Sequence, residues 1–203
     1  MSIVNMTNSK HNIMTLCCLI VLTGCASSSR SPINSANDSC DNEQILTITT
    51  CSGDEVSAEE KRLYNMVNGY RDQYDLPSIP LSKSLSLVAN RHVQDLHKNI
   101  GELTHAWSNC DYEAGVSKTY PCMWKAPQRL GTTYTGYGFE NAHGGTGGYL
   151  ANADTSLSSW KSSKPHNAVI LNQGIWQEHP WNALGVGIYQ GYAVLWFGKK
   201  FDK

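Results

Sequence analysis

The stretch Leu-Gly-Val-Gly-Ile-Tyr at 184–189 and Tyr-Ala-Val-Leu-Trp-Phe at 192–197, joined by Gln190-Gly191, decides the fold of this chain. Two apolar runs that flank a two-residue turn containing glycine are typical of a β-hairpin. The second run is almost continuously apolar and does not alternate, which indicates a strand covered on both faces. Helices on both sides of a small sheet satisfy this pattern, so the periodicity predicts an α+β domain.

Three helices are expected around this hairpin. The first begins at the capping-box sequence Ser57-Ala-Glu-Glu60 and continues at helical spacing until Pro77. A second covers about 82–99, and a third covers 151–162. His92 falls on or beside the apolar stripe of the second helix, so we expect it to pack there and not to bind a ligand. Between Gly101 and Gly148 the sequence is rich in glycine, proline and aromatic residues and predicts irregular structure.

The N-terminal end carries an export signal. An apolar stretch at 13–22 is shorter than the about 20 residues that a membrane-spanning helix needs, but it suits a signal peptide. Leu-Thr-Gly-Cys at 22–25 resembles a bacterial lipobox, which predicts that residues 1–24 are removed and that Cys25 is lipidated. The alternative is an ordinary signal cleaved near Ala26, with Cys25 an incidental thiol. The absence of Asp after Cys25 favours the outer membrane.

The rest of the chain is predicted to be a tether and one domain. Residues 26–56 are rich in Ser, Asn, Asp and Thr, so 25–56 is expected to be a lipidated Cys with a flexible tether, and 57–203 a single domain. The chain has 16 Lys and Arg against 17 Asp and Glu, a formal net charge of −1 at pH 7. Without a basic block, nucleic acid is excluded as a partner, and the expected partner is the membrane that holds the lipid.

Four cysteines remain beyond the signal and the lipidation site: Cys40, Cys51, Cys110 and Cys122. Four thiols in an exported protein predict two disulfides and allow three connectivities. Proximity in the sequence favours pairing Cys40 with Cys51 and Cys110 with Cys122. A zinc site made of the four cysteines is disfavoured, because the sequence has no C-x-x-C pair.

Three short motifs precede the hairpin: T-H-A-W at 104–107, G-F-E-N at 138–141 and W-K-S-S-K-P-H-N at 160–167. In this order and spacing, together with 185–198, they resemble the CAP superfamily, also called the SCP/PR-1-like or cysteine-rich secretory protein family, in its short bacterial form. The likeness covers roughly Ser57 to Phe201. It implies a three-layer α-β-α sandwich with a small central, mainly antiparallel sheet.

The resemblance also implies a cleft with two His and two acidic residues, in which the His pair of several members binds a divalent metal such as zinc. The motifs place the imidazoles at His105 and His166 and one carboxylate at Glu140. Ser163 stands where the family has its second acid, and Pro165 replaces the glycine before the second His. The three matching residues are candidate ligands for zinc or another divalent metal. The alternative is that they only hydrogen-bond neighbouring loops to one another.

Three functions are compatible with these residues. The first is a non-enzymatic module of the bacterial envelope that binds a metal and, as the resemblance implies, a lipid, sterol or cell-wall ligand. The second is a metal-dependent hydrolase of peptide or wall material with Glu140 as its catalytic base. The third is a structural or host-facing surface protein with a vestigial cleft. The missing second acid favours the first and third over catalysis. Trp176 and Trp181 are candidates for the ligand rim, although packing is the favoured interpretation of both.

Overall fold

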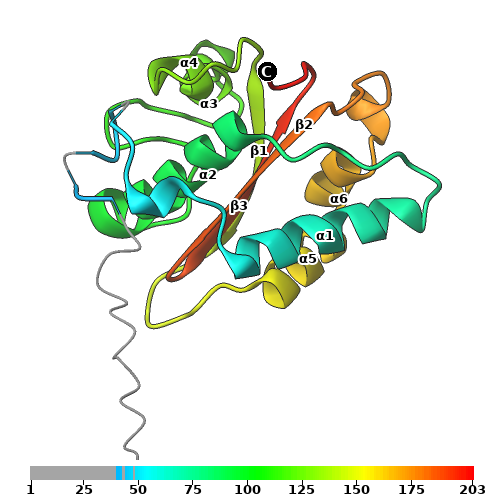
Figure 1. Cartoon of the computed structure of the whole chain (residues 1–203), viewed down its shortest axis with the longest axis horizontal. Helices are drawn as coiled ribbons and strands as arrows, with labels where there is room; N and C mark the ends of the chain where they lie inside the picture. The colour runs from blue at the N-terminus through cyan, green and yellow to red at the C-terminus, as the bar shows by residue number, and fades with distance from the viewer. Residues whose placement is uncertain (1–39, 43, 48) are drawn as a thin grey trace, which may run out of the picture. The chain divides into compact units, whose positions relative to one another are not determined.

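A three-stranded antiparallel sheet lies at the centre of the domain (Figure 1). The computed structural model describes residues 40–203 except 43 and 48, and within these residues the strands are β1 (Gly138–Gly144), β2 (Ala183–Tyr189) and β3 (Tyr192–Gly198). Strand β3 lies in the middle and pairs antiparallel with both neighbours. Tyr189 lies opposite Tyr192, so the hairpin has the turn that the sequence predicts.

Helices form the outer layers of the domain. Helix α1 begins with the predicted capping box, in which the Ser57 hydroxyl accepts from the Glu60 N–H and the Glu60 carboxylate accepts from the Ser57 N–H. The helices of the described chain are α1 (Ala58–Asp72), α2 (Lys83–Asp95), α3 (Pro121–Trp124), α4 (Ala126–Arg129), α5 (Ala153–Ser162) and α6 (Lys164–Ile170), with short turns η1 (Ser52–Asp54), η2 (Leu96–Ile100), η3 (Ser117–Thr119) and η4 (Gly174–Trp176).

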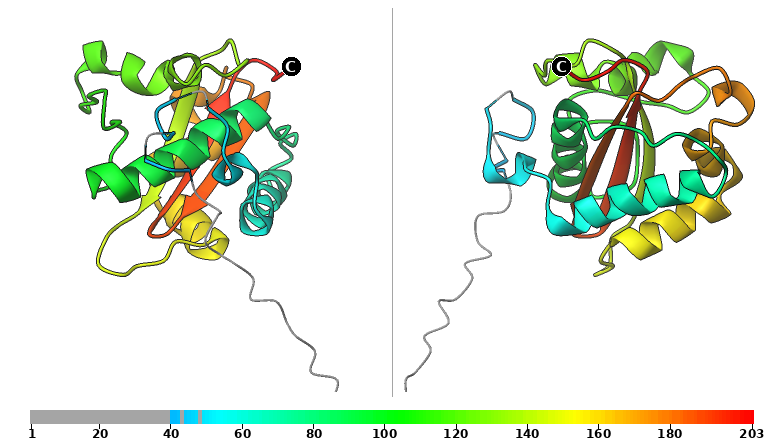
Figure 2. Two further views of the ribbon diagram at one scale, coloured as in Figure 1. Left: turned by 60° about the vertical axis from the view of Figure 1, so that its left-hand side comes forward. Right: turned by 45° about the vertical axis from the view of Figure 1, so that its right-hand side comes forward.

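The two faces of β3 contribute to two separate cores. Leu195 and Phe197 pack with the apolar residues of α1, α5 and α6, whereas Val194 and Trp196 pack with those of α2, α3 and α4. Figure 2 shows α2 on one side of the sheet and α1 with α5 on the other. The observed architecture is therefore the three-layer α-β-α arrangement with a small antiparallel sheet, as expected.

Glycines on β2 let α2 pack directly on the strand. A Cβ at Gly185 would lie 2.2 Å from the backbone carbon of Leu85, and one at Gly187 would lie 2.5 Å from that of Ala89. Any side chain at these two positions would force the helix away from the sheet. The close contact fixes α2 on β2 and thereby positions His92, which projects from α2 toward the site described below.

The prediction of irregular structure for 101–148 is wrong in part. Strand β1 and the short helices α3 and α4 lie within that range. Helix α5 begins at Ala153, two residues after the predicted start, and a further helix, α6, follows Ser163 although none was predicted there. Strand β1 matters most, because it carries the G-F-E-N motif and Glu140.

The N-terminal segment 40–56 belongs to the folded domain, so the predicted tether ends earlier than residue 56. Cys40 and Ile45 are fully buried. The guanidinium of the fully buried Arg91 donates to Asp54, with Nη2 at 2.8 Å from Oδ2, and to the carbonyl oxygens of Gln44, Thr47 and Thr49. Arg91 on α2 therefore holds the segment against the domain.

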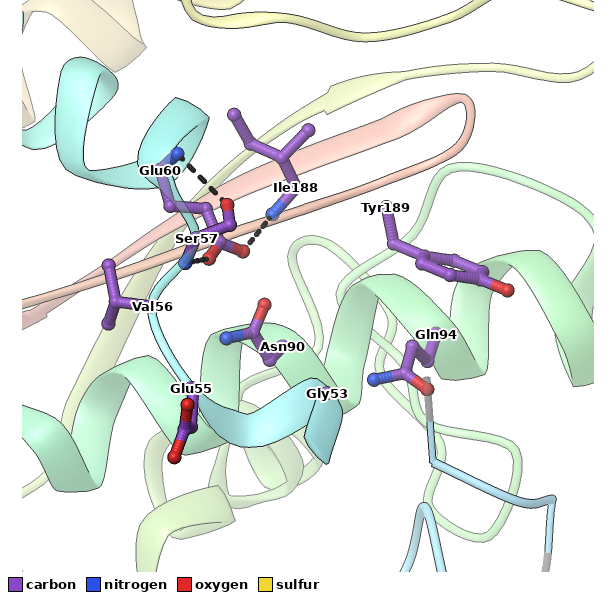
Figure 3. Close-up of a pocket in the computed structure, with 9 residues that line it drawn as sticks. All are labelled: Gly53, Glu55, Val56, Ser57, Glu60, Asn90, Gln94, Ile188 and Tyr189. Carbon is purple, nitrogen blue, oxygen red and sulfur yellow. Dashed lines mark hydrogen bonds between the residues drawn. The ribbon is translucent and has the colours of Figure 1, made fainter. Parts of the chain in front are cut away.

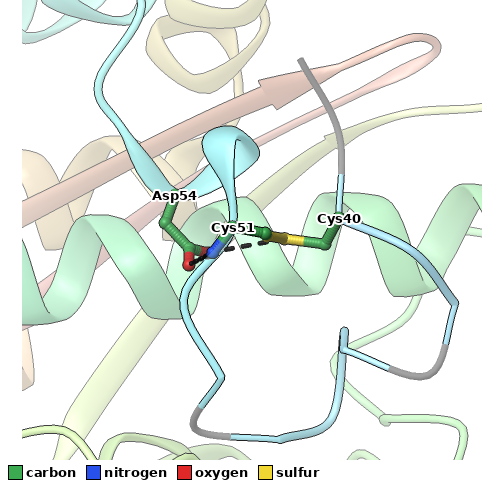
Figure 4. Close-up of side chains that lie close together, drawn as sticks. All are labelled: Cys40, Cys51 and Asp54. Carbon is green, nitrogen blue, oxygen red and sulfur yellow. Dashed lines mark hydrogen bonds between the residues drawn. A yellow bond between two sulfur atoms is a disulfide. The ribbon is translucent and has the colours of Figure 1, made fainter. Parts of the chain in front are cut away.

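Both disulfides have the connectivity that sequence proximity favours. Cys40 is bonded to Cys51, as Figure 4 shows beside Asp54, and Cys110 is bonded to Cys122. The first pair closes the segment that Arg91 holds. The second pair closes the loop that carries Tyr112 and Tyr120.

The predicted signal peptide at 1–24 and the predicted lipidation site, Cys25, lie outside the described residues. Among the residues that the structure does describe, none of the helices has both the length and the apolar character needed to cross a membrane.

Candidate functional site

Glu140 lies at the centre of the candidate site. Its side chain is fully buried on β1, and it bridges two imidazoles. Oε1 lies 2.5 Å from Nδ1 of His92 on α2, and Oε2 lies 2.6 Å from Nδ1 of His105 in the loop after η2. Both carboxylate oxygens are therefore occupied by partners from within the chain.

The contact of the second ring nitrogen of His92, Nε2, shows that this nitrogen carries a proton. Nε2 is 2.9 Å from the carbonyl oxygen of Ala106, which can only accept, so Nε2 carries a proton. Burial lowers the pKa of His92, but the charge and hydrogen bond of Glu140 outweigh burial and raise it overall. Burial raises the pKa of Glu140, and the two imidazoles reverse this and bring it to about 2. The pair is a buried imidazolium and carboxylate, whose charges balance.

His105 is held by the same carboxylate. Because Glu140 is ionised, Nδ1 of His105 donates to it, and Nε2 is the ring nitrogen that remains outside this contact. Nε2 makes no hydrogen bond with the described residues, and the side chain is 27% exposed at the cleft. The ring edge packs against Tyr112, with centroids 5.1 Å apart.

His166 enters the cleft from α6. Its Nδ1 lies 2.9 Å from the Oγ of Ser163, the residue that replaces the second family acid. Burial lowers the pKa of His166, and repulsion from His105 lowers it further, so the ring is neutral near pH 7. Pro165 falls in the first turn of α6, where a missing N–H leaves no helical hydrogen bond unmade. The two departures from the family pattern therefore do not distort the local backbone.

Asn141 links β1 to α6 beneath this imidazole. Its Nδ2 donates to the carbonyl oxygen of His166 at 3.0 Å. Its Oδ1 is buried and has no hydrogen-bond partner among the described residues. A buried acceptor without a partner costs about 1–3 kcal/mol, and such groups are rare in folded proteins.

The imidazoles open into a cleft of about 430 Å³. Its floor consists of polar residues on β1 and α6, and its walls are aromatic or apolar. The lining residues are His105, Tyr112, Tyr120, Met123, Trp124, Phe139, Glu140, Asn141, Pro165, His166, Val169, Ile175 and Trp176. The size and the few converging polar groups are typical of a small-molecule site.

The two rim candidates differ in position. Trp176 is half-buried and lines the cleft. Trp181 is buried, donates from Nε1 to the carbonyl oxygen of Val169 at 2.8 Å, and packs in the core beside Phe197. Trp181 therefore packs in the core, in line with the favoured interpretation, whereas Trp176 lines the cleft.

The residues available to bind a divalent metal differ from the expected set of His105, His166 and Glu140. Both oxygens of Glu140 are bonded to imidazoles. In the described chain, three His, Cys, Asp or Glu ligand atoms lie within 4.8 Å of one another only at Cys40, Cys51 and Asp54, where the two sulfurs form a disulfide. The imidazoles that line the cleft are those of His105 and His166. Imidazole nitrogens are acceptable ligands for such an ion. Glu140 orients one imidazole from behind, as carboxylates do in many metal sites.

His92 and Asn141 are the functional residues that sequence reasoning assigned otherwise. His92 does pack in α2, as expected, and it also provides the counter-charge of Glu140. The position of His92 in the sequence could have indicated this partner, because a polar ring on the apolar stripe of a helix needs a buried hydrogen-bond partner. Asn141 belongs to the G-F-E-N motif, and its Nδ2 binds the backbone of α6 at His166.

The fold is shared with solved structures of known class. An extracellular protein containing an SCP domain from Bacillus anthracis is similar over 70% of this chain and 40% of that chain, with 20% identity and a TM-score of 0.52. An outer surface protein from Borrelia burgdorferi is similar over 72% of this chain and 96% of that chain, with 16% identity and a TM-score of 0.51. The chain thus spans two fifths of the Bacillus protein.

No family model and no curated protein matches the chain. The structural likeness and the three-layer sandwich together define the class. The chain has the fold of the SCP domain, which is the fold that its motifs predict for a bacterial member of the CAP superfamily.

Proposed function

We propose that this protein is a non-enzymatic binding module of the bacterial envelope, whose cleft takes a divalent metal through His105 and His166. The observation that carries the proposal is that both imidazoles line one cleft of about 430 Å³, and that Nε2 of His105 has no hydrogen-bond partner among the described residues. A bound zinc ion would act as a Lewis acid on a ligand oxygen.

The position of Glu140 argues against a hydrolase. A general base has to reach the proton that it removes, and its pKa has to lie near the working pH. The Glu140 side chain is fully buried, both oxygens are bonded to imidazoles, and the pKa is held at about 2. Such a carboxylate positions His105 but is a poor base for a water molecule in the cleft.

Export and lipid anchoring are part of the same proposal. Leu-Thr-Gly-Cys at 22–25 supports lipidation of Cys25, and the two similar structures are an extracellular protein and an outer surface protein. The outer membrane is the favoured location. A lipid, sterol or cell-wall fragment remains the proposed class of larger ligand, which the aromatic wall of the cleft would accommodate.

The test is a calorimetric zinc titration of the metal-stripped, detergent-solubilised protein. We expect saturable one-to-one binding that is lost in both His105→Ala and His166→Ala. His97→Ala, on the exposed end of η2, is the control and should bind zinc like the wild type. If a folded wild type takes up no zinc, or if the control loses as much as the cleft variants, the proposed metal site is wrong.

A further inference from the structure

The two edges of the central sheet differ in how their outward backbone groups are used. Strand β2 forms one edge, and its outward N–H groups donate to acceptors elsewhere in the domain. The three pairs are Leu184 with the Pro80 carbonyl oxygen, Val186 with the Ser86 hydroxyl and Ile188 with the Glu60 carboxylate. An open sheet edge accepts a further strand, and these bonds prevent that on β2.

Strand β1 forms the other edge, and its register on β3 determines which of its backbone groups point outward. The Gly145 N–H donates to the carbonyl oxygen of Gly191, which places Gly144 at a position that exchanges no hydrogen bonds with its partner on β3. Such positions alternate with bonded ones in an antiparallel ladder. The N–H and C=O groups of Glu140 and Ala142 therefore also point away from β3.

The edge of β1 is open at Glu140. Trp160 of α5 donates from Nε1 to the carbonyl oxygen of Ala142 at 3.1 Å and covers the edge at that residue. Within the described residues, the outward N–H and C=O of Glu140 make no hydrogen bond. The side chain of Glu140 is 0% exposed and the whole residue is 7% exposed, so its exposed surface belongs to the backbone. Glu140 therefore lines the cleft with its main chain.

The open edge lies between the two imidazoles of the cleft. The carboxylate of Glu140 lies 2.6 Å from Nδ1 of His105, and Nδ2 of Asn141 donates to the carbonyl oxygen of His166 at 3.0 Å. Successive side chains of a strand point to opposite faces of the sheet. His105 and His166 therefore flank the edge from its two sides, and an extended chain seated on the edge would run between them.

The walls of the cleft suit the alternating side chains of such a chain. Tyr112 packs beside His105 with ring centroids 5.1 Å apart, and Phe139 lies 5.4 Å from Trp176. Ile175 at the rim is 82% exposed. No Lys or Arg is among the described residues that line the cleft, so the carboxylate of a chain end would find no counter-charge. The cleft therefore suits an uncharged internal segment with apolar side chains.

We propose that the cleft binds an uncharged, extended peptide segment as an added strand on β1, and that one residue of the peptide exchanges two backbone hydrogen bonds with Glu140. Strand addition to an open sheet edge is a general mode of peptide binding. The side chain of the paired residue would lie on the His105 side, and those of its neighbours on the Phe139 side. The peptide shares the cleft with the proposed metal, but the inference goes beyond that function because backbone groups carry it and no metal is needed.

The test compares two peptides with identical side chains: acetyl-Val-Thr-Val-amide and its analogue with an N-methyl group on the central residue. Methylation removes the N–H that would donate to the Glu140 carbonyl oxygen. Each peptide is titrated into the chelator-treated, detergent-solubilised full-length protein, and ¹⁵N-resolved amide shifts and hydrogen exchange are followed. We expect the unmethylated peptide to bind about ten-fold more tightly, which corresponds to the loss of one hydrogen bond. It should also shift the Glu140 N–H and slow its exchange.

Two matched variants test the wall of the cleft. Ile175→Ser removes an exposed aliphatic side chain at the rim and should weaken binding of the unmethylated peptide. Leu150→Ser removes an aliphatic side chain that is 65% exposed and lies outside the cleft, so it should bind the peptide like the wild type. Both positions are on the surface, where a substitution has little effect on stability.

Three results would overturn the inference. The first is equal affinity for the two peptides, which would make the cleft an apolar groove without strand pairing. The second is binding that leaves the shift and the exchange of the Glu140 N–H unchanged. The third is the absence of peptide binding in a folded protein. Zinc titration of the same samples separates the two proposals, because zinc binding without peptide binding removes only the added strand, and peptide binding without zinc binding removes only the metal.

Discussion

Glu140 shows how one buried charge determines the chemistry of its neighbours. It keeps His92 protonated and fixes Nδ1 of His105 as a donor, so the other ring nitrogen of His105, Nε2, lies outside this contact. Neither effect requires Glu140 to touch a ligand. The residue that the resemblance suggests as a ligand or base is here the group that orients the imidazole of His105.

Replacing Glu140 by glutamine should destabilise the whole domain. Glu140→Gln leaves His92 without a counter-charge in the core, and breaking a buried ion pair in this way typically costs about 3–5 kcal/mol. We expect a loss of about 3 kcal/mol in the free energy of unfolding, measured by urea denaturation. Glu178→Gln removes the same charge from an exposed position and should change stability by less than about 0.5 kcal/mol. Equal losses in the two variants would contradict the buried ion pair.

At the residue scale the sequence predicts which side chains converge but not what each one does. The motif residues His105, Glu140 and His166 line the same cleft, and their role as metal ligands stays a prediction. They do not reveal that His92, 48 residues before Glu140, takes one of its oxygens. That contact depends on the distance between α2 and β1, which is set by the packing of the whole sheet and leaves no local pattern in the sequence.

At the scale of elements, the segment 40–56 depends on a single side chain. Arg91 is buried, and its guanidinium binds the Asp54 carboxylate and three carbonyl oxygens of the segment. The planar fork of arginine meets several acceptors at once, which the single ammonium of lysine cannot do. The sequence could not show this, because the segment has no periodicity and its partner is on another element.

Arg91→Lys should therefore loosen this segment while the rest of the domain stays folded. We expect faster amide hydrogen exchange across 44–54 and a loss of about 2 kcal/mol in stability, since the Asp54 carboxylate and the carbonyls of Gln44, Thr47 and Thr49 lose donors. Arg62→Lys is the matched control. Arg62 pairs with Glu59 and Asp154 at the surface, where its side chain is 43% exposed, and such pairs contribute little. Unchanged exchange at 44–54 in Arg91→Lys would show that the disulfide alone holds the segment.

The elements that the sequence predicts are those with strong local patterns. The hairpin, α1 and α2 follow from periodicity, turn residues and capping. Strand β1 has the sequence Gly-Phe-Glu-Asn-Ala-His-Gly, with little of the β-branched content that marks strands. It forms because β3 offers a partner for all seven residues, and a Cβ at Gly138 would lie 2.6 Å from the Trp196 ring. Tertiary pairing, which is not a local signal, decides this strand.

At the scale of the whole molecule, Glu60 connects three layers. Its carboxylate caps α1 through the Ser57 N–H at 2.7 Å and also accepts from the Ile188 N–H on β2 at 2.8 Å, and Figure 3 shows both bonds. Asn90 of α2 lies beside it in a pocket of about 340 Å³. Glu60 is 2% exposed, and burial raises the pKa of its carboxyl above the ordinary 4.5. The folded chain therefore binds this proton more tightly than the unfolded chain does.

The consequence is a loss of stability as the pH rises. The contribution of Glu60 is fully present below about pH 4.5, its ordinary pKa, and is lost as the pH rises through the higher pKa of the folded state. Glu60→Gln cannot titrate, so the difference in unfolding free energy between wild type and variant should fall with pH across this window. Glu140 does not interfere, because both proteins contain it and its contribution cancels in the difference. Urea denaturation at pH 4 to 8 measures the slope, and Glu55→Gln, an exposed neighbour in the same pocket, should keep the wild-type slope. A Glu60→Gln curve parallel to the wild type would mean that the carboxylate stays charged in the folded protein, stabilised by the two backbone N–H groups despite its burial.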